Sequence, residues 1–139
     1  MNFDFSDEQK ELRDQARRFF KDRCTTKVPR RILEGAEPYA KDLWGAVCEM
    51  GYTAAAMPEE YGGIGSGYLE LCVIAEEIGR AVAPIPFSSS VYVAAEAILL
   101  CGSKEQKERY LPKLASGEMI GTYAVAEGPH APAASNLQT

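Results

Sequence analysis

The apolar stretch VYVAAEAILLC, Val91 to Cys101, constrains the fold of this chain more than any other feature. If it forms a helix, that helix is apolar on nearly every side, with Glu96 as its single charged residue. Such a helix is stable where other elements cover it all round, so we expect it at the centre of a helical bundle. It is far too short to cross a bilayer, which takes about 20 apolar residues.

Further helices are predicted from apolar residues at helical spacing and from capping signals. Two capping boxes, Ser6 with Gln9 and Ser103 with Gln106, mark helix starts, because each pair caps the first turn reciprocally. The predicted helices are Asp7 to Arg23, Tyr39 to Met50, Tyr68 to Arg80 and Ser103 to about Leu114, with a helical turn at Arg30 to Glu34 and a shortened or bent last turn at Pro112. The fold class predicted for the chain is therefore all-α.

The predicted helix from Tyr68 to Arg80 has a core side and a polar side. The core side comprises Leu71, Cys72, Ala75 and Ile78, and the polar side comprises Glu70, Glu76, Glu77 and Arg80. Two adjacent glutamates suggest an acid/base pair as one interpretation. Because Glu76 and Glu77 both fall on the polar side, a solvated helix face is the favoured interpretation.

Charge and cysteine spacing exclude several classes of protein. The chain has 139 residues and a net charge of -5, whereas a nucleic-acid binder needs a basic face to neutralise phosphates. Its four cysteines stand more than twenty residues apart and His130 is its only histidine, so we expect buried, reduced thiols and no metal site. The N-terminus MNFDFSDEQK carries acidic residues where a signal peptide needs basic ones. These features predict a cytoplasmic protein.

The glycine-rich stretch MPEEYGGIGSGY, Met57 to Tyr68, allows two interpretations. A phosphate cradle needs either G-x-G-x-x-G after a strand or a P-loop with its lysine. Gly63 and Gly65 begin the first pattern, but its last position falls on Tyr68, and no lysine completes the second. The favoured alternative is a tight loop between two helices that uses positive φ angles and close packing.

A single strand is predicted after the helices. The segment IGTYAVAE, Ile120 to Glu127, is the only convincing strand in the sequence. A lone strand leaves both of its hydrogen-bonding edges unpaired, so we expect a larger polypeptide or another chain to supply the missing sheet. We assign residues 1–118 to an α-helical domain and residues 119–139 to the truncated start of a β domain.

Five segments together resemble the N-terminal helical domain of the acyl-CoA dehydrogenase family. They are FSDEQKELRDQARRFF, MPEEYGGIG, EEIGRAVAPIPF, GSKEQKERYLPKLASGE and GTYAVAE, in the family's order and at its spacing. The resemblance implies a subunit with an N-terminal helical domain, a middle β domain and a C-terminal helical domain. This chain would hold the first domain and the opening strand of the second. In the family the glycine loop joins two helices, which supports the structural interpretation of that loop.

The resemblance implies that the complete protein is an oxidoreductase that uses FAD in fatty acid metabolism. It would catalyse α,β-dehydrogenation of an acyl-CoA thioester, in which a carboxylate base takes the α-proton and flavin N5 takes the β-hydride. An electron-transferring flavoprotein or a similar acceptor would reoxidise the flavin, and the subunits would form homo- or hetero-oligomers. The family's catalytic glutamate lies in the C-terminal domain, so no catalytic residue is assigned in this chain.

The resemblance also implies where the acyl tail and the flavin would lie. In the family a buried helix lines the acyl tail, and a later strand contacts the flavin ring and the thioester arm. The matching positions for the substrate are Ser89, Ser90, Val93 and Pro132, and those for the cofactor are Tyr123, Val125 and Ala126.

Two of these positions depart from the family pattern. Ala126 replaces a threonine whose hydroxyl bonds the flavin, and Pro132 replaces a serine near the substrate. Alanine has no hydroxyl, and proline lacks even a backbone donor. The alternative function is therefore a non-catalytic family member that serves as the structural partner of an active subunit. The unpaired strand argues against a third interpretation, an independent helical binding module.

Overall fold

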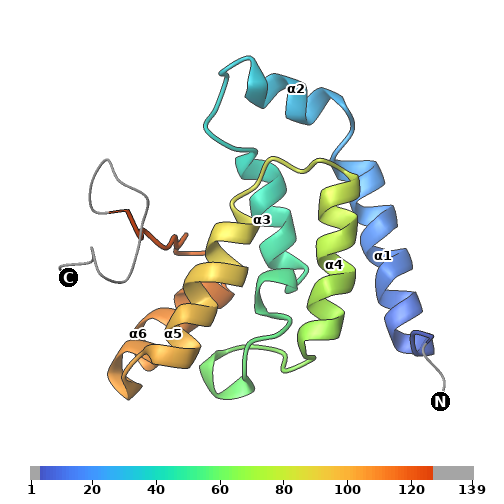
Figure 1. Ribbon diagram of the computed structural model, residues 1–139. Helices are drawn as coiled ribbons and strands as arrows, with labels where there is room; N and C mark the ends of the chain where they lie inside the picture. The colour runs from blue at the N-terminus through green and yellow to red at the C-terminus, as the bar shows by residue number, and fades with distance from the viewer. Residues whose placement is uncertain (1–3, 127–139) are drawn as a thin grey trace.

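The computed structural model describes residues 4–126, and all of its regular elements are helices (Figure 1). This confirms the predicted helical bundle. The α-helices are α1 (Asp7–Arg23), α2 (Lys27–Leu33), α3 (Lys41–Glu49), α4 (Tyr68–Arg80), α5 (Glu96–Cys101) and α6 (Lys104–Ala115). Two short 3-10 helices, η1 (Tyr52–Ala54) and η2 (Glu59–Tyr61), precede α4, and a π-helix, η3 (Ser88–Ala95), runs directly into α5.

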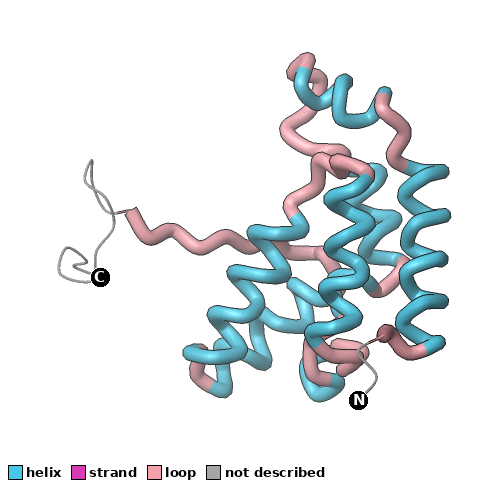
Figure 2. The backbone as a smooth tube through the Cα atoms, turned by 45° about the vertical axis from the view of Figure 1, so that its right-hand side comes forward, coloured by secondary structure: helices cyan, strands magenta, loops and turns pink. Residues whose placement is uncertain are grey.

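The helices α1, α4 and α3 lie side by side, and α2 crosses one end of them (Figures 1 and 2). The main core lies between α1, α3 and α4, where Phe20 and Val47 are almost completely buried. A second cluster lies between α6 and the chain around η1, and Leu111 and Met57 are buried in it. The bundle therefore has a larger and a smaller apolar core.

Sequence signals placed most helix ends correctly. Both capping boxes are formed, at Ser6 with Gln9 and at Ser103 with Gln106. The helix α6 continues through Pro112 to Ala115, so the proline does not shorten it. The predicted helical turn near Arg30 is a full helix, α2, and it places Pro29 in the first turn, where a missing N–H costs nothing.

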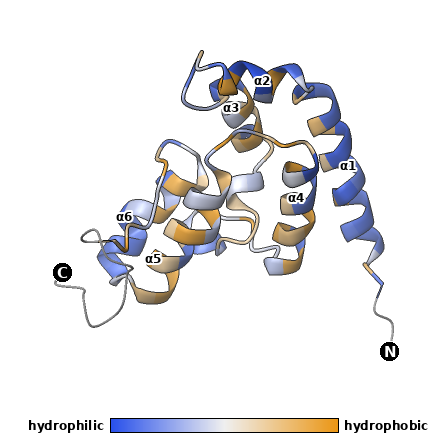
Figure 3. Ribbon diagram, turned by 45° about the horizontal axis from the view of Figure 1, so that its top comes forward, coloured by the Kyte–Doolittle hydropathy of each residue, from blue (hydrophilic) through white to orange (hydrophobic). Residues whose placement is uncertain are grey.

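The apolar stretch from Val91 to Cys101 is not the central helix that its composition predicts. Its first part is the π-helix η3 and its second part is α5, which lies at the edge of the bundle (Figure 3). The side chain of Leu100 is 72% exposed and that of Val93 is 41% exposed. No residue of α5 is buried. The chain thus leaves one side of this apolar element uncovered.

The predicted strand is not formed within the described residues. Residues 120–126 run away from the bundle without strand pairing (Figures 1 and 2). A strand is defined by hydrogen bonds to a neighbour, and the part of the chain that the structure describes offers this segment no other strand. The sequence predicted a strand that pairs with a sheet from outside this chain, so a strand in the complete protein stays a prediction.

The helix α4 has its predicted limits, but its buried face is rotated from the predicted one. The buried residues are Leu71, Val73, Ile74 and Glu77, whereas Cys72 is exposed. The expectation that all the thiols are buried was also wrong, because Cys101 is exposed as well. Met50, the last residue of the helix predicted from Tyr39 to Met50, is 43% exposed.

Candidate functional site

The glycine-rich loop before α4 is a closed structural turn. The N–H groups of Gly63 and Gly65 donate to the carbonyls of Pro58 and Met57, at 3.1 and 2.9 Å. A Cβ atom at Gly63 would collide with the Met57 carbonyl, so only glycine fits there. Because these amides are bonded within the loop, they cannot cradle a phosphate. This confirms the helix-to-helix interpretation.

Two of the three predicted acyl-tail residues lie at the surface of η3. Val93 is 41% exposed and Ser89 is partly exposed, with its hydroxyl donating to the Pro86 carbonyl at 3.3 Å. Ser90 is completely buried. Its Oγ accepts a hydrogen bond from the Gly121 N–H at 3.2 Å. Ser90 thus fixes the segment that follows α6, while Ser89 and Val93 face outward.

Close packing brings Gly121 against η3, before the rest of the segment leaves the bundle (Figure 2). A Cβ atom at Gly121 would lie 2.5 Å from the Cβ of Ala94, so the glycine permits a contact that no other residue would. Beyond it, Tyr123 is 60% exposed and Ala126 is exposed, whereas Val125 is partly buried. The segment that carries the predicted flavin positions therefore meets η3 at Gly121, which contacts Ser90 and Ala94.

The backbone N–H groups of Val125 and Ala126 are available for hydrogen bonding. Among the described residues, nothing accepts a hydrogen bond from the N–H groups of Val125 and Ala126. A flavin ring presents acceptor atoms that such amides suit. These two amides are free to donate to an acceptor outside the described residues, and Ala126 adds no side-chain hydroxyl. Pro132, Glu127 and His130 lie outside the described residues.

The surface of η3 and α5 carries a single charged side chain, Glu96. Burial, with a smaller contribution from nearby Cys72, raises the pKa of Tyr92 to about 12, so its phenol stays neutral at physiological pH. The carboxylate of Glu96 accepts a hydrogen bond of 2.7 Å from the Tyr68 hydroxyl. This face can exclude water from a bound apolar group, and it offers no free acid or base among its described residues.

The structure forms an ion-pair cluster that the sequence analysis missed. Glu77 is 1% exposed and accepts two hydrogen bonds from Arg17, at 2.8 and 3.2 Å, and lies 3.3 Å from Nε of Arg80. The hydrogen bond from Arg17 holds the pKa of Glu77 below its ordinary value, against the effect of burial. A carboxylate expected to be solvated instead joins α1 to α4. The spacing in the sequence is consistent with this burial. Glu77 lies three residues after Ile74 and four after Val73, which places it on the same face of the helix as these buried residues.

The described residues contain no group of histidine, cysteine or acidic side chains arranged to hold a metal ion. None of the described helices is long and apolar enough to cross a membrane.

Comparison with known proteins identifies the helical part of the chain. The family model for the N-terminal domain of acyl-CoA dehydrogenases matches residues 6–118. The chain belongs to the acyl-CoA dehydrogenase family. This confirms the resemblance that the five sequence segments indicated, and the match covers every helix described above.

Relatives and solved structures of this family agree with the match. The mitochondrial isovaleryl-CoA dehydrogenase of Arabidopsis thaliana is 34% identical over 125 residues, which is 88% of this chain and 31% of that protein. An acyl-CoA dehydrogenase from Bacillus anthracis, solved in complex with FAD, has a TM-score of 0.81 at 32% identity over 92% of this chain and 22% of that one.

A heteromeric relative is also similar in structure. A chain of the ChsE4-ChsE5 complex from Mycobacterium tuberculosis has a TM-score of 0.79 at 27% identity over 88% of this chain and 34% of that one.

The chain spans only about 30% of the length of the curated relatives it matches. The activity of a complete family member therefore depends on residues that lie outside it.

Proposed function

We propose that this chain is the N-terminal part of an FAD-dependent acyl-CoA dehydrogenase that catalyses α,β-dehydrogenation of an acyl-CoA thioester. The observation that carries the proposal is the family match over residues 6–118. Residues 1–118 would form the helical domain, and residues 119–139 would begin the β domain. The catalytic base would come from another part of the complete protein.

The uncovered face of η3 and α5 would form the wall along the acyl tail. Ser89 and Val93 would face the tail, since their side chains are at least partly exposed. Ser90 would act indirectly, because its buried hydroxyl holds Gly121 in place. The exclusion of water from the reacting carbons strengthens electrostatic interactions at the site. The small side chains leave room for a sizeable acyl group.

The segment after Gly121 would meet the flavin. The N–H groups of Val125 and Ala126 would donate to the ring, and Tyr123, which is 60% exposed, would lie beside it. When bound, the flavin supplies a hydride acceptor for the β-carbon. Pro132 would lie near the substrate. An electron-transferring flavoprotein or a similar acceptor would take up the electrons.

The test is the visible absorption spectrum of the purified full-length gene product, with and without a panel of acyl-CoA thioesters. We expect flavin bands that bleach when a suitable thioester is added. A complete chain with its β domain that folds without flavin contradicts the proposal. The response across the panel also gives the acyl-chain specificity.

A second candidate is a non-catalytic subunit that supports an active dehydrogenase. It is favoured by Ala126 and Pro132, which remove a hydroxyl and a backbone donor from positions that face the flavin and the substrate in the family. The similarity to a chain of the ChsE4-ChsE5 complex gives a heteromeric precedent. Co-purification of a colourless product with a second, flavin-containing dehydrogenase subunit supports this candidate. Flavin-loaded, active homo-oligomers exclude it.

The cellular compartment stays a prediction. The sequence predicts the cytoplasm, whereas several curated relatives carry names that place them in mitochondria. Fractionation of cells that express the full-length product from its own gene distinguishes the two.

A further inference from the structure

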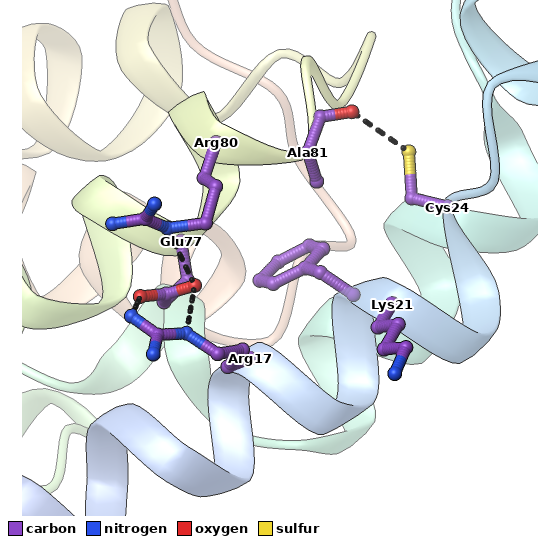
Figure 4. A pocket seen from close by; sticks show the side chains of 7 residues that line it. Arg17, Lys21, Cys24, Glu77, Arg80 and Ala81 are labelled. Atoms are coloured by element: carbon purple, nitrogen blue, oxygen red, sulfur yellow. Dashed lines mark hydrogen bonds and ion pairs between the residues drawn. The ribbon is translucent and has the colours of Figure 1, made fainter.

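A pocket of about 320 Å³ lies between the C-terminal halves of α1 and α4 (Figure 4), and no residue of η3 or α5 lines it. From α1 it is lined by Arg17, Phe20 and Lys21, followed by Cys24, and from α4 by Glu77 and Arg80, followed by Ala81. Its volume falls near the lower end of the range of roughly 300–1,000 Å³ typical of small-molecule sites. Nothing in the function proposed above uses it.

The two ends of this pocket differ in chemistry. Arg17, Glu77 and Arg80 gather at one end, and Cys24 and Ala81 lie at the other (Figure 4). Phe20 is 1% exposed and Cys24 is 6% exposed, so both belong to the floor of the pocket. The pocket therefore joins a charged end to an apolar end.

The buried carboxylate fixes two guanidinium groups at the charged end. Glu77 bonds Nε and Nη2 of Arg17 and lies 3.3 Å from Nε of Arg80. The side chains of Arg17 and Arg80 remain 46% and 55% exposed. Among the described residues, the Nη1 groups of both arginines have no partner, so each arginine keeps a donor for a ligand.

The net charge of the lining favours an anion. Arg17, Lys21 and Arg80 carry three positive charges against the one negative charge of Glu77. Glu76 binds Arg80 at 2.7 Å and Asp14 lies near Arg17, so these two carboxylates beside the site offset the excess. The unpaired guanidinium donors therefore remain the feature of the pocket that suits an anion. The ammonium group of Lys21 points away from Glu77, so it adds charge at the rim without a direct contact (Figure 4).

We infer that this pocket binds a small monoanion with an apolar tail, such as a short- or medium-chain carboxylate. The carboxylate meets the free guanidinium donors of Arg17 and Arg80, and the tail lies along Phe20 and Cys24 toward Ala81. A charge-assisted hydrogen bond to arginine is strong and directional. A phosphate would satisfy the charged end alone and leave the apolar floor in contact with water.

The test is photo-crosslinking of the full-length gene product with an octanoic acid that carries a diazirine in its tail, followed by peptide mass spectrometry. We expect labelling of the α1 and α4 peptides that contain Phe20, Cys24 and Ala81. An excess of octanoate should suppress the labelling, and equal concentrations of 1-octanol or inorganic phosphate should not. This experiment does not depend on flavin or on dehydrogenase activity.

Charge variants locate the carboxylate. Arg80→Gln should weaken competition by octanoate roughly tenfold, since it removes a charged donor while Arg17 still holds Glu77. Lys21→Gln should weaken it by a smaller factor, because that side chain has no partner among the described residues. Arg18→Gln is the matched control, because Arg18 lies next to Arg17 on α1 and does not line the pocket.

Four results overturn the inference. They are labelling confined to η3 and α5, equal competition by octanol, equal competition by phosphate, and an effect of Arg18→Gln as large as that of Arg80→Gln. Equal competition by octanol would show that the pocket binds apolar molecules without regard to charge. Equal competition by phosphate would show that it binds anions in general. A circular dichroism melt of each variant confirms that the comparison is made between folded proteins.

Discussion

The α1–α4 pair and the η3–α5 segment are both amphipathic or apolar helical regions, and they differ in how completely the chain covers them. Between α1 and α4, Phe20 and Ile74 are 1% exposed, and the carboxylate of Glu77 is buried while its partners Arg17 and Arg80 stay about half-exposed. On η3 and α5, Val93 and Leu100 face solvent. Apart from the pocket between their C-terminal halves, α1 and α4 cover each other's apolar side chains, whereas the η3–α5 region has an apolar face that the described chain leaves open.

The region that contributes most to folding stability therefore differs from the region that carries the proposed acyl-tail site. The covered region contributes most to the free energy of folding, because the burial of large apolar side chains is the main favourable contribution to it. The uncovered region carries the positions proposed for the acyl tail, and it contacts the segment proposed to meet the flavin at Gly121. Substitutions in the two regions should therefore have different consequences, and the following experiments measure this difference.

The largest expected effect is that of Phe20→Ala in the covered region. The Phe20 ring packs against Phe19 and Tyr52, with centroid separations of 5.0 and 6.3 Å. Its removal leaves a cavity in the core between α1, α3 and α4, so the free energy of unfolding should fall by about 3–5 kcal/mol. Urea denaturation followed by circular dichroism measures it. A loss below about 1 kcal/mol would show that this core is loosely packed.

Glu77→Gln should have the next largest effect. The change removes the charge that holds Arg17 and Arg80, and the free energy of unfolding should fall by about 1–3 kcal/mol. The loss is smaller than for a fully buried pair because both guanidinium groups stay half-exposed to water. Glu76→Gln on the neighbouring exposed residue is the control and should change stability by less than about 0.5 kcal/mol.

The effect of Glu77→Gln should depend on pH. The pKa of Glu77 is lower in the folded protein than its ordinary value of 4.5, so its contribution is fully present above pH 4.5. That contribution is lost as the pH falls through the folded-state pKa. The difference in unfolding free energy between the original protein and the variant should therefore be constant from pH 7 to about pH 5 and shrink below it. A difference that grows on acidification contradicts the assignment.

Gly121→Ala tests the boundary between the two regions. The added methyl group would lie 2.5 Å from Ala94, so the segment 121–126 should move off η3. The free energy of global unfolding should change by less than about 1 kcal/mol, because only a peripheral contact is lost. Hydrogen exchange at the amide of residue 121 should speed up, since its bond to Ser90 is broken. Unchanged exchange would show that η3 accommodates the methyl group.

Leu100→Ser should have the smallest effect on stability. Leu100 is 72% exposed, so the free energy of unfolding should stay within about 0.5 kcal/mol of the original value. If another part of the complete protein covers α5, the same change should destabilise the full-length product by more than it destabilises residues 1–126. Chemical denaturation of both forms makes the comparison. Equal effects in both would show that this face stays open.

Much of the fold was predictable because its signals are local. The serine and glutamine of each capping box lie three residues apart and marked the starts of α1 and α6 correctly. The glycines of the loop before α4 indicated a tight turn, and their amides are bonded within that turn. The order and spacing of five short segments indicated the family, which the match over residues 6–118 confirms.

The errors arose where distant residues decide the outcome. The apolar pattern from Val91 to Cys101 predicted burial, but a pattern states only that a surface should be covered, and the described chain does not cover it. The burial of Glu77 depends on Arg17, which lies sixty residues away in the sequence. The strand predicted from Ile120 to Glu127 stays a prediction, because its pairing needs a neighbour that the described chain does not provide.

The sequence by itself determined the helical class, most helix ends, the closed glycine loop and the family, because capping, turn formation and apolar periodicity act between residues close in the chain. Only the tertiary structure decided that Glu77 is buried, that Ser90 holds Gly121, and that η3 and α5 keep an open face beside the proposed flavin segment. Burial and ion pairing depend on which helices meet, and that geometry is set by the packing of the whole bundle.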